Sequence, residues 1–407
     1  MSLFRRERIS SKLYIFEKGC IEVSFVSEKS KGMPRSVIRE MFAMQAGLTD
    51  VVSFALGEPD FTTPKHIIDA TVESFQRGET HYTPNTGIPA LRKAVSETYQ
   101  RRGLTYAPEE VLIGAGAVSV LNLACGAILD PGDEVLIPDP GWPNYRGMIL
   151  QAGGVLVPVK LREEDGFMYS LDALQAKITP KTKAIVINSP SNPTGGVATE
   201  ENLRQIAELV QKQDLYVIAD EIYHELLWSG EPYTSIAAFP GMKERTVIVD
   251  GFSKQYAMTG FRLGWAVGPV EVITTMTKLL ENVLSSVNEG VQWGGVAALT
   301  GDQTCVEEMK KVYLKRRELM VKGLNRIDKI SCLLPKGAFY AFANISRTGL
   351  SSREFAIRLL QEKRTVVVPG TGFGQGGEGF IRLSYATSEA NIQEGLKRID
   401  EFVKSLG

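Results

Sequence analysis

Cysteine and histidine are both scarce in this chain of 407 residues. The four cysteines show no paired spacing, which excludes a disulfide framework and is typical of reduced thiols in a cytoplasmic protein. The three histidines lack the spacing of metal ligands, so we expect no metal site. The residues concerned are Cys20, Cys125, Cys305, Cys332, His66, His81 and His224.

A strong net charge and long uninterrupted apolar segments are lacking as well. Basic and acidic residues nearly balance, to a net charge of −1, so we expect no nucleic-acid or membrane partner. The uncharged stretch 111–129 has the length of a membrane helix, but Gly114, Gly116 and Gly126 interrupt it. A strand, a glycine turn and a buried helix explain it better. The first thirty residues contain no apolar core of a signal peptide, and we expect an arm or extension there.

Apolar runs alternate with helical patterns such as 200–211 from residue 111 onward, in a chain long enough for two domains. This alternation predicts an α/β fold with a doubly wound, mostly parallel sheet. Ligands of such sheets bind just beyond the carboxyl ends of the strands. After residue 290 the pattern changes to that of an α+β end domain. The seven expected strands are 111–113, 134–137, 155–159, 184–188, 215–219, 246–249 and 263–267.

A lysine and an arginine follow the expected strand at 246–249. Lys254 lies in a turn that contains glycine and serine, and Arg262 comes eight residues later. A lysine beside a strand end can be desolvated, so that its neutral amine attacks an aldehyde. An arginine nearby can hold a phosphate by two parallel hydrogen bonds. The pattern suggests a Schiff base with pyridoxal 5′-phosphate, but by spacing alone a surface lysine and arginine are the better explanation, because both residue types are common.

The longer stretch decides between these interpretations. Ser253-Lys254, followed by Ala-Met-Thr-Gly-Phe-Arg-Leu-Gly at 257–264, resembles the cofactor-lysine signature of class I aminotransferases of fold type I, the aspartate aminotransferase type. The resemblance extends from about residue 33 to the C-terminus. It implies a small domain formed by 33–64 and 296–407, a large cofactor-binding domain at 65–295, and an extension at 1–32. One position departs, because Gly251 stands where the family often has Ser or Thr for a phosphate hydrogen bond.

Several motifs match the cofactor site of that family. Gly116 and Ala117 lie where a strand gives way to a helix, and backbone N–H groups at a helix start bind phosphate. The resemblance implies that they hold the cofactor phosphate with Ser253 and Arg262. Trp142, in Pro-Gly-Trp-Pro-Asn-Tyr, has the aromatic face to stack on a pyridine ring. Without these motifs, a core tryptophan is equally consistent with the sequence.

Polar residues after two further strands complete this cofactor set. Asn192, in a loop shaped by prolines, is expected to donate its amide to the phenolic oxygen of the cofactor, and Tyr223 reaches the same oxygen. Asp220 follows an apolar strand, and burying a carboxylate without a partner is costly. Opposite the pyridine nitrogen it would keep that nitrogen protonated and make the ring an electron sink. For an isolated aspartate, a helix cap is the alternative.

The remaining matches concern the substrate and a second subunit. Arg382 lies within an apolar strand, where a buried arginine needs an anion, and the family places its α-carboxylate arginine there. Gly57 is expected beside the same carboxylate, and Asn192 is expected to contact the substrate as well as the cofactor. Tyr82 is implied to reach the cofactor phosphate of the neighbouring subunit, which predicts a homodimer with shared active sites. Arg35 lies in the segment that borders the substrate pocket in relatives.

The expected function is amino transfer between an α-amino acid and a 2-oxo acid, with Lys254 as Schiff-base residue and proton carrier. Alternatives are a C–S β-lyase of the same fold, which shares the early chemistry, and a non-catalytic regulatory module that binds the cofactor. Relatives that act on aspartate hold its distal carboxylate with a lysine at the position of Ala117 or with an arginine near the segment 280–284. This chain has neither cation. We therefore hypothesise that donors with uncharged side chains are preferred, unless Arg35 supplies the charge.

Overall fold

The computed structural model describes residues 25–34, 36–230 and 232–407. The chain divides into two compact units, 1–34 and 35–407. The described part of the first contains the short helix α1 (Glu28–Lys31). Most of the expected extension at 1–32 therefore lies outside the described residues, and so does Arg35. None of the described helices combines the length and the apolar character needed to cross a membrane.

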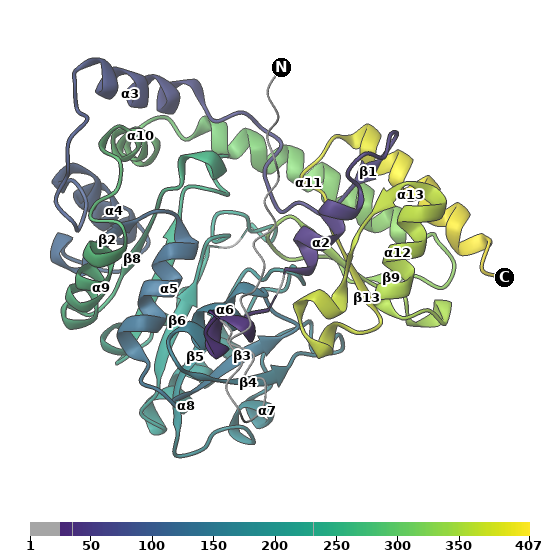
Figure 1. Ribbon diagram of the computed structural model, residues 1–407, viewed down its shortest axis with the longest axis horizontal. Helices are drawn as coiled ribbons and strands as arrows, with labels where there is room; N and C mark the ends of the chain where they lie inside the picture. Colours follow the sequence, from purple (N-terminus) through teal and green to yellow (C-terminus); the bar gives the residue numbers. More distant parts are fainter. Residues whose placement is uncertain (1–24, 35, 231) are drawn as a thin grey trace, which may run out of the picture. The chain divides into compact units, whose positions relative to one another are not determined.

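A sheet of seven strands forms the centre of the unit 35–407 (Figure 1). Six of its strands run in one direction, and only β8 runs against its two neighbours, β2 and β7. All seven strands lie where the sequence predicts them, which confirms the α/β fold with a mostly parallel sheet. In spatial order they are β2 (Val111–Gly114), β8 (Gly264–Val267), β7 (Thr246–Gly251), β6 (Tyr216–Asp220), β5 (Thr182–Asn188), β3 (Glu134–Asp139) and β4 (Val155–Lys160).

Both faces of this sheet are buried, which explains the near-continuous apolar runs of its strands. Successive side chains of a strand point to opposite faces. In β5, Ala184 and Val186 join a core cluster with α5, α6 and α9, whereas Ile185 and Ile187 join a second cluster that includes residues of α4 and α8. These helices are α4 (Pro89–Arg101), α5 (Ala117–Ile128), α6 (Asn144–Gln151), α8 (Glu200–Lys212) and α9 (Val270–Val283).

A smaller antiparallel sheet contains β12 (Val368–Pro369), β13 (Phe380–Ser384), β10 (Tyr340–Asn344) and β9 (Ser331–Cys332) in that order. β1 (Val52–Ser53) pairs in parallel with β11 (Thr365–Val366), so an early segment joins the C-terminal part of the chain. The long helix α11 (Thr304–Leu324) packs against α13 and β10 on this side of the unit (Figure 1). The other helices are α2 (Val37–Met44), α3 (Lys65–Gln76), α7 (Leu171–Gln175), α10 (Glu289–Thr300), α12 (Ser352–Lys363) and α13 (Glu389–Lys404).

The sheet register brings polar side chains to one edge. Asn188 and Asp220 are the last residues of β5 and β6, and they are paired directly across the two strands. β7, the next strand, ends at Gly251, three residues before Lys254. Because parallel strands end at the same edge, this arrangement gathers these groups without any further folding of loops.

Candidate active site

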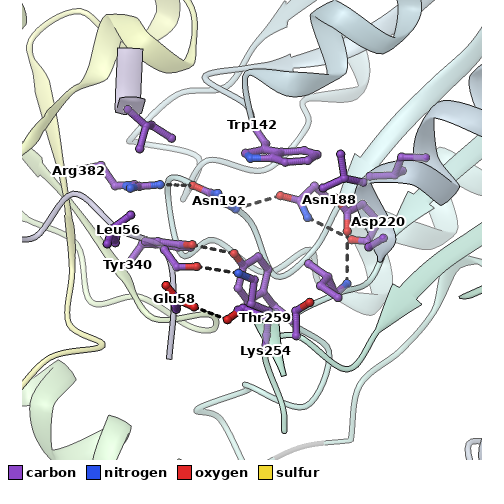
Figure 2. A pocket seen from close by; sticks show the side chains of 18 of the residues that line it. Leu56, Glu58, Trp142, Asn188, Asn192, Asp220, Lys254, Thr259, Tyr340 and Arg382 are labelled. Carbon is purple, nitrogen blue, oxygen red and sulfur yellow. Dashed lines mark hydrogen bonds between the residues drawn. The ribbon is translucent and has the colours of Figure 1, made fainter. Parts of the chain in front are cut away.

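A cavity of about 330 Å³ opens at the carboxyl ends of the central strands. Asp220 and Arg382 lie at opposite ends of it, and Trp142 lies across it from Lys254 (Figure 2). Both sheets contribute to its wall, because Asp220 belongs to the seven-stranded sheet and Arg382 to β13 of the smaller one. A cavity with a lysine, an aspartate and an arginine at separate places can hold an elongated, doubly charged ligand.

Lys254 is held against the early segment of the chain. Its Nζ donates to the carbonyl of Gly57 at 2.6 Å and faces the rings of Tyr223 and Phe339 at 6.0 and 5.9 Å from their centroids. Burial lowers the pKa of Lys254 to about 8, although the carboxylate of Glu58 opposes this shift. The amine is therefore neutral more often than an ordinary lysine, as attack on a carbonyl carbon requires.

Asp220 is a buried carboxylate, 4% exposed, whose position is fixed by two hydrogen bonds. Tyr145 donates its hydroxyl to Oδ2 at 2.5 Å, and the backbone N–H of Ile222 donates to Oδ1 at 3.3 Å. Burial raises the pKa of Asp220 to about 6, although the Tyr145 hydrogen bond works against the shift. Asp220 is followed by a turn rather than by a helix, so the helix-cap interpretation is wrong.

Arg382 is almost fully buried, at 1% exposure, and aimed at the cavity. It donates through Nη1 to Oδ1 of Asn192 at 3.1 Å and through Nη2 to the carbonyl of Ala55. Its Nε has no hydrogen-bond partner among the described residues. Its guanidinium also lies 4.5 Å from the centroid of the Tyr340 ring. A buried guanidinium with an unused N–H is suited to a carboxylate ligand.

Asn192 and Tyr223 also border the cavity. Because the Oδ1 of Asn192 accepts from Arg382, its Nδ2 is the atom left to donate to a ligand. The hydroxyl of Tyr223 lies 2.7 Å from that of Tyr340, and burial raises the pKa of Tyr223 well above its ordinary value. Tyr223 is therefore a neutral hydrogen-bonding group in the cavity.

The start of α5 and Arg262 form an anion cradle at one side. Gly116 caps the helix with φ +82°, and a Cβ there would lie 2.6 Å from Nη2 of Arg262. Arg262 itself adopts the left-handed conformation, with φ 54°, and donates to the carbonyl of Thr259 at 2.8 Å. The first N–H groups of a helix have no partner within it. A phosphate placed there would meet both the helix start and the guanidinium.

The structure brings most of the predicted residues together. Those that line the cavity are Gly57, Ala117, Trp142, Asn192, Asp220, Tyr223, Ser253, Lys254, Arg262 and Arg382, and Gly116 lies directly behind Arg262. Tyr82 is not among them. Its side chain is 87% exposed and borders a separate hollow with Trp293. Arg35 lies outside the described residues.

Two aromatic residues of the site were missed by sequence reasoning. Tyr340 contacts both Tyr223 and Arg382, and its hydroxyl lies so close to Gly57 that a Cβ there would be 2.1 Å away. Tyr145 holds Asp220. Tyr145 ends the Pro-Gly-Trp-Pro-Asn-Tyr motif at 140–145, and Tyr340 ends the stretch Lys-Gly-Ala-Phe-Tyr at 336–340. The signal was therefore present, but nothing in it pointed to the partner of either hydroxyl.

The described cysteines, Cys125, Cys305 and Cys332, are free thiols, and Cys20 lies outside the described residues. Among the residues described, no group of histidine, cysteine and acidic side chains is arranged to hold a metal ion.

Comparison with known proteins identifies the family. The family model described as "Aminotransferase class I and II" matches residues 49–399. The chain is 43% identical over 382 residues to a putative aminotransferase, YugH, of Bacillus subtilis. The matched region covers 93% of this chain and 98% of that protein. It is 42% identical over 380 residues to an aspartate aminotransferase of Pyrococcus horikoshii, with 93% and 97% covered.

Solved structures agree with the sequence relatives. The aromatic aminotransferase of Pyrococcus horikoshii superimposes with a TM-score of 0.86 and 40% identity, covering 90% of this chain and 99% of that one. The match of fold, length and sequence extends over both sheets. This chain belongs to the class I and II aminotransferases.

Proposed function

We propose that this aminotransferase binds pyridoxal 5′-phosphate at Lys254 and transfers the amino group of α-amino acids with uncharged side chains to a 2-oxo acid. One observation carries the proposal: Lys254, Asp220 and Arg382 converge on a single cavity with an anion cradle beside them. Enzymes of this family use that cofactor.

The residues present fit the cofactor. Lys254 supplies the amine, the Gly116 and Arg262 cradle supplies phosphate donors, and Asp220 supplies an anion for a pyridine nitrogen. Asn192 and Tyr223 offer donors for a phenolic oxygen, and Trp142 offers a flat face. Ser253 and Ala117 lie close enough to line the phosphate end. When bound, the cofactor supplies an electron sink for the charge that develops at the substrate Cα.

The protein's own groups then have defined tasks. Arg382 binds the α-carboxylate and thereby orients the Cα–H bond of the substrate. Lys254 would take the proton from Cα and deliver it to the C4′ carbon of the cofactor, because its amine has a pKa near the working pH. Asp220, fixed by Tyr145, holds a negative charge where the ring nitrogen would lie. Gly57 leaves room beside Tyr340 for the carboxylate end of the substrate.

Substrate preference follows from the charges of the wall. The described cations that line the cavity are Lys254, Arg262 and Arg382, and each already has a proposed role. The rest of the wall includes the apolar Ile38, Leu56 and Val118, together with the acidic Glu58. Burying a second substrate carboxylate beside Glu58 without a cation is costly. Uncharged side chains of the alanine, methionine or phenylalanine kind therefore fit best.

A donor panel tests this preference. We expect kcat/KM for phenylalanine or methionine to exceed that for aspartate by at least about tenfold. This factor corresponds to the free-energy cost of leaving one buried polar group unpaired. Conversion of the cofactor absorption band with each donor and 2-oxoglutarate gives the values. The same panel in Arg35→Ala is the decisive control, since a strong aspartate preference that collapses in this variant would make Arg35 the specificity residue. Release of pyruvate and ammonia in place of amine transfer would favour the C–S β-lyase alternative.

We also propose a homodimer in which Tyr82 reaches the cofactor phosphate of the partner subunit. The great exposure of Tyr82 and the hollow that it lines with Pro84, Ile88 and Trp293 support an uncovered interface on this face. Large exposed apolar side chains gathered in one place commonly mark such contacts.

Mixing of inactive subunits tests this arrangement. Lys254→Ala and Tyr82→Ala subunits should each have little activity, but one of the two sites in a hybrid would combine an intact Lys254 with an intact Tyr82. Random exchange should therefore restore about a quarter of the wild-type activity, because half of the dimers are hybrids with one complete site. Absence of recovery, from subunits shown to exchange by mass spectrometry, would mean that Tyr82 does not act across the interface.

A further inference from the structure

A cluster of buried charges lies outside the cavity, next to the turn that follows β6. Its members are Arg102 at the end of α4, Glu221 and His224 in and beside the turn, and Asp250 in β7. Glu221, His224 and Asp250 are 1%, 4% and 0% exposed, so these ionisable groups are almost completely withdrawn from water. Buried charges are costly unless they are paired, and the roles proposed above use none of them.

Glu221 is held from two sides. Arg102 donates to its Oε2 at 2.5 Å, and the hydroxyl of Ser235 donates to its Oε1. The backbone N–H of Glu221 also donates to the carbonyl of Val249 in β7 at 2.9 Å. The guanidinium of Arg102 in turn lies against the ring of Tyr233, 5.2 Å from its centroid. Glu221 is adjacent to Asp220, so these contacts restrict the backbone that carries the Asp220 carboxylate.

His224 joins the same turn to β7. Its Nδ1 lies 2.9 Å from Oδ2 of Asp250 and 3.2 Å from the carbonyl oxygen of Glu221. Its Nε2 lies 3.4 Å from Glu225, which also faces Lys310 of α11 at 3.9 Å. Burial alone would lower the pKa of His224, but the Asp250 carboxylate raises it to about 9. Tyr233 contributes a ring contact at 6.0 Å and no charge.

We propose that His224 is a positioning residue of the aminotransferase site, which acts by bridging the turn after β6 to the end of β7. β6 ends at Asp220, the turn after it carries Tyr223, and β7 leads into the loop that carries Lys254. A histidine cation between Asp250 and the Glu221 carbonyl therefore fixes the positions of Asp220 and Tyr223 relative to Lys254. This inference rests on the proposed roles of Asp220 and Lys254.

The bridge also balances charge. Asp220, Glu221 and Asp250 place carboxylates at the neighbouring ends of β6 and β7, where Arg102 pairs with Glu221 and Asp250, and His224 pairs with Asp250. Loss of the His224 cation would leave Asp250 with Arg102 alone, at 3.8 Å. The additional negative field at the end of β7 would favour the protonated form of the Lys254 Nζ in the cofactor-loaded enzyme, because opposite charges stabilise each other in a medium of low dielectric constant.

The test follows the absorbance of the cofactor-loaded enzyme as a function of pH. In His224→Gln we expect the midpoint of the cofactor band to rise by at least about half a pH unit, as a nearby uncompensated charge requires. We expect kcat to fall about tenfold with KM for the donor changed less than about threefold, since geometry rather than substrate binding is affected. Addition of Asp250→Asn to His224→Gln should return the midpoint to near its wild-type value.

Matched variants exclude a merely structural role. Arg102→Gln, which removes the other cation, should shift the midpoint upward as well, and it serves if His224→Gln does not fold. The neighbouring surface variant Arg101→Gln and the remote His66→Gln should leave it unchanged. If either His224→Gln or Arg102→Gln loses thermal stability without a shift of the midpoint, this inference is overturned, whereas the proposed function is unaffected. A wild-type enzyme without a pH-dependent cofactor band would overturn the proposed function and this inference with it.

Discussion

Replacement of Lys254 by alanine should abolish transamination, with a loss of at least about a thousandfold, because one amine provides both the covalent attachment and the proton transfer. The cavity itself should survive, since the anion cradle of Gly116 and Arg262 does not involve Lys254. We therefore expect the variant to bind pyridoxal 5′-phosphate non-covalently. Its cofactor spectrum should be that of the free aldehyde.

Two measurements check this expectation: turnover with the best donor of the panel, and the visible spectrum of the loaded variant. Lys243→Ala is the matched control, because Lys243 is a partly buried lysine that pairs with Glu110 at 2.9 Å and does not line the cavity. It should retain both the covalent band and turnover. Near-wild-type activity of Lys254→Ala would contradict the assignment of Lys254 as the residue that binds the cofactor covalently.

Asp220→Asn should lower kcat at least roughly a hundredfold, the order expected when a group that controls protonation is lost. The amide is nearly the same size as the carboxylate and can still accept the hydrogen bond of Tyr145, so the fold and the cavity should remain. Only the negative charge opposite the cofactor ring is lost. A neutral pyridine ring withdraws electrons poorly from Cα.

Single-turnover kinetics of the conversion of the cofactor band measure this loss without the contribution of product release. Asp139→Asn provides the control, since Asp139 ends β3 of the same sheet and burial likewise raises its pKa, yet it does not line the cavity. If Asp139→Asn were as slow as Asp220→Asn, the effect would reflect damage to the sheet. Weak cofactor binding with intact turnover in Asp220→Asn would contradict the role proposed for its charge.

The seven strands of the large sheet follow from local sequence. Runs such as 184–188 and 246–249 are apolar on both faces, and only a strand that is covered on both sides tolerates this pattern. Element ends were less precise. The helix α2, for example, begins at Val37, because Ser36 accepts from the N–H of Arg39 and caps the helix there.

The chemistry of individual residues was also readable. Lys254, Asp220 and Arg382 were singled out because a lysine, a carboxylate or an arginine beside or within an apolar strand needs a partner or a function. Their motifs identified the family that the comparisons then established. What these motifs lacked was any measure of distance between segments far apart in the chain. The contact between Lys254 and Gly57, for example, joins residues 197 positions apart.

The sequence by itself determined the α/β architecture, the aminotransferase family and the residues whose chemistry requires a site, because these depend on periodicity and on local residue types. Only the tertiary structure decided which of those residues share a cavity, which hydroxyl supports Asp220, and that Tyr340 lies between Tyr223 and Arg382. It alone also revealed the bridge between His224 and Asp250. The physical reason is that burial and charge pairing depend on the distance between segments in the folded chain, which local pattern does not encode.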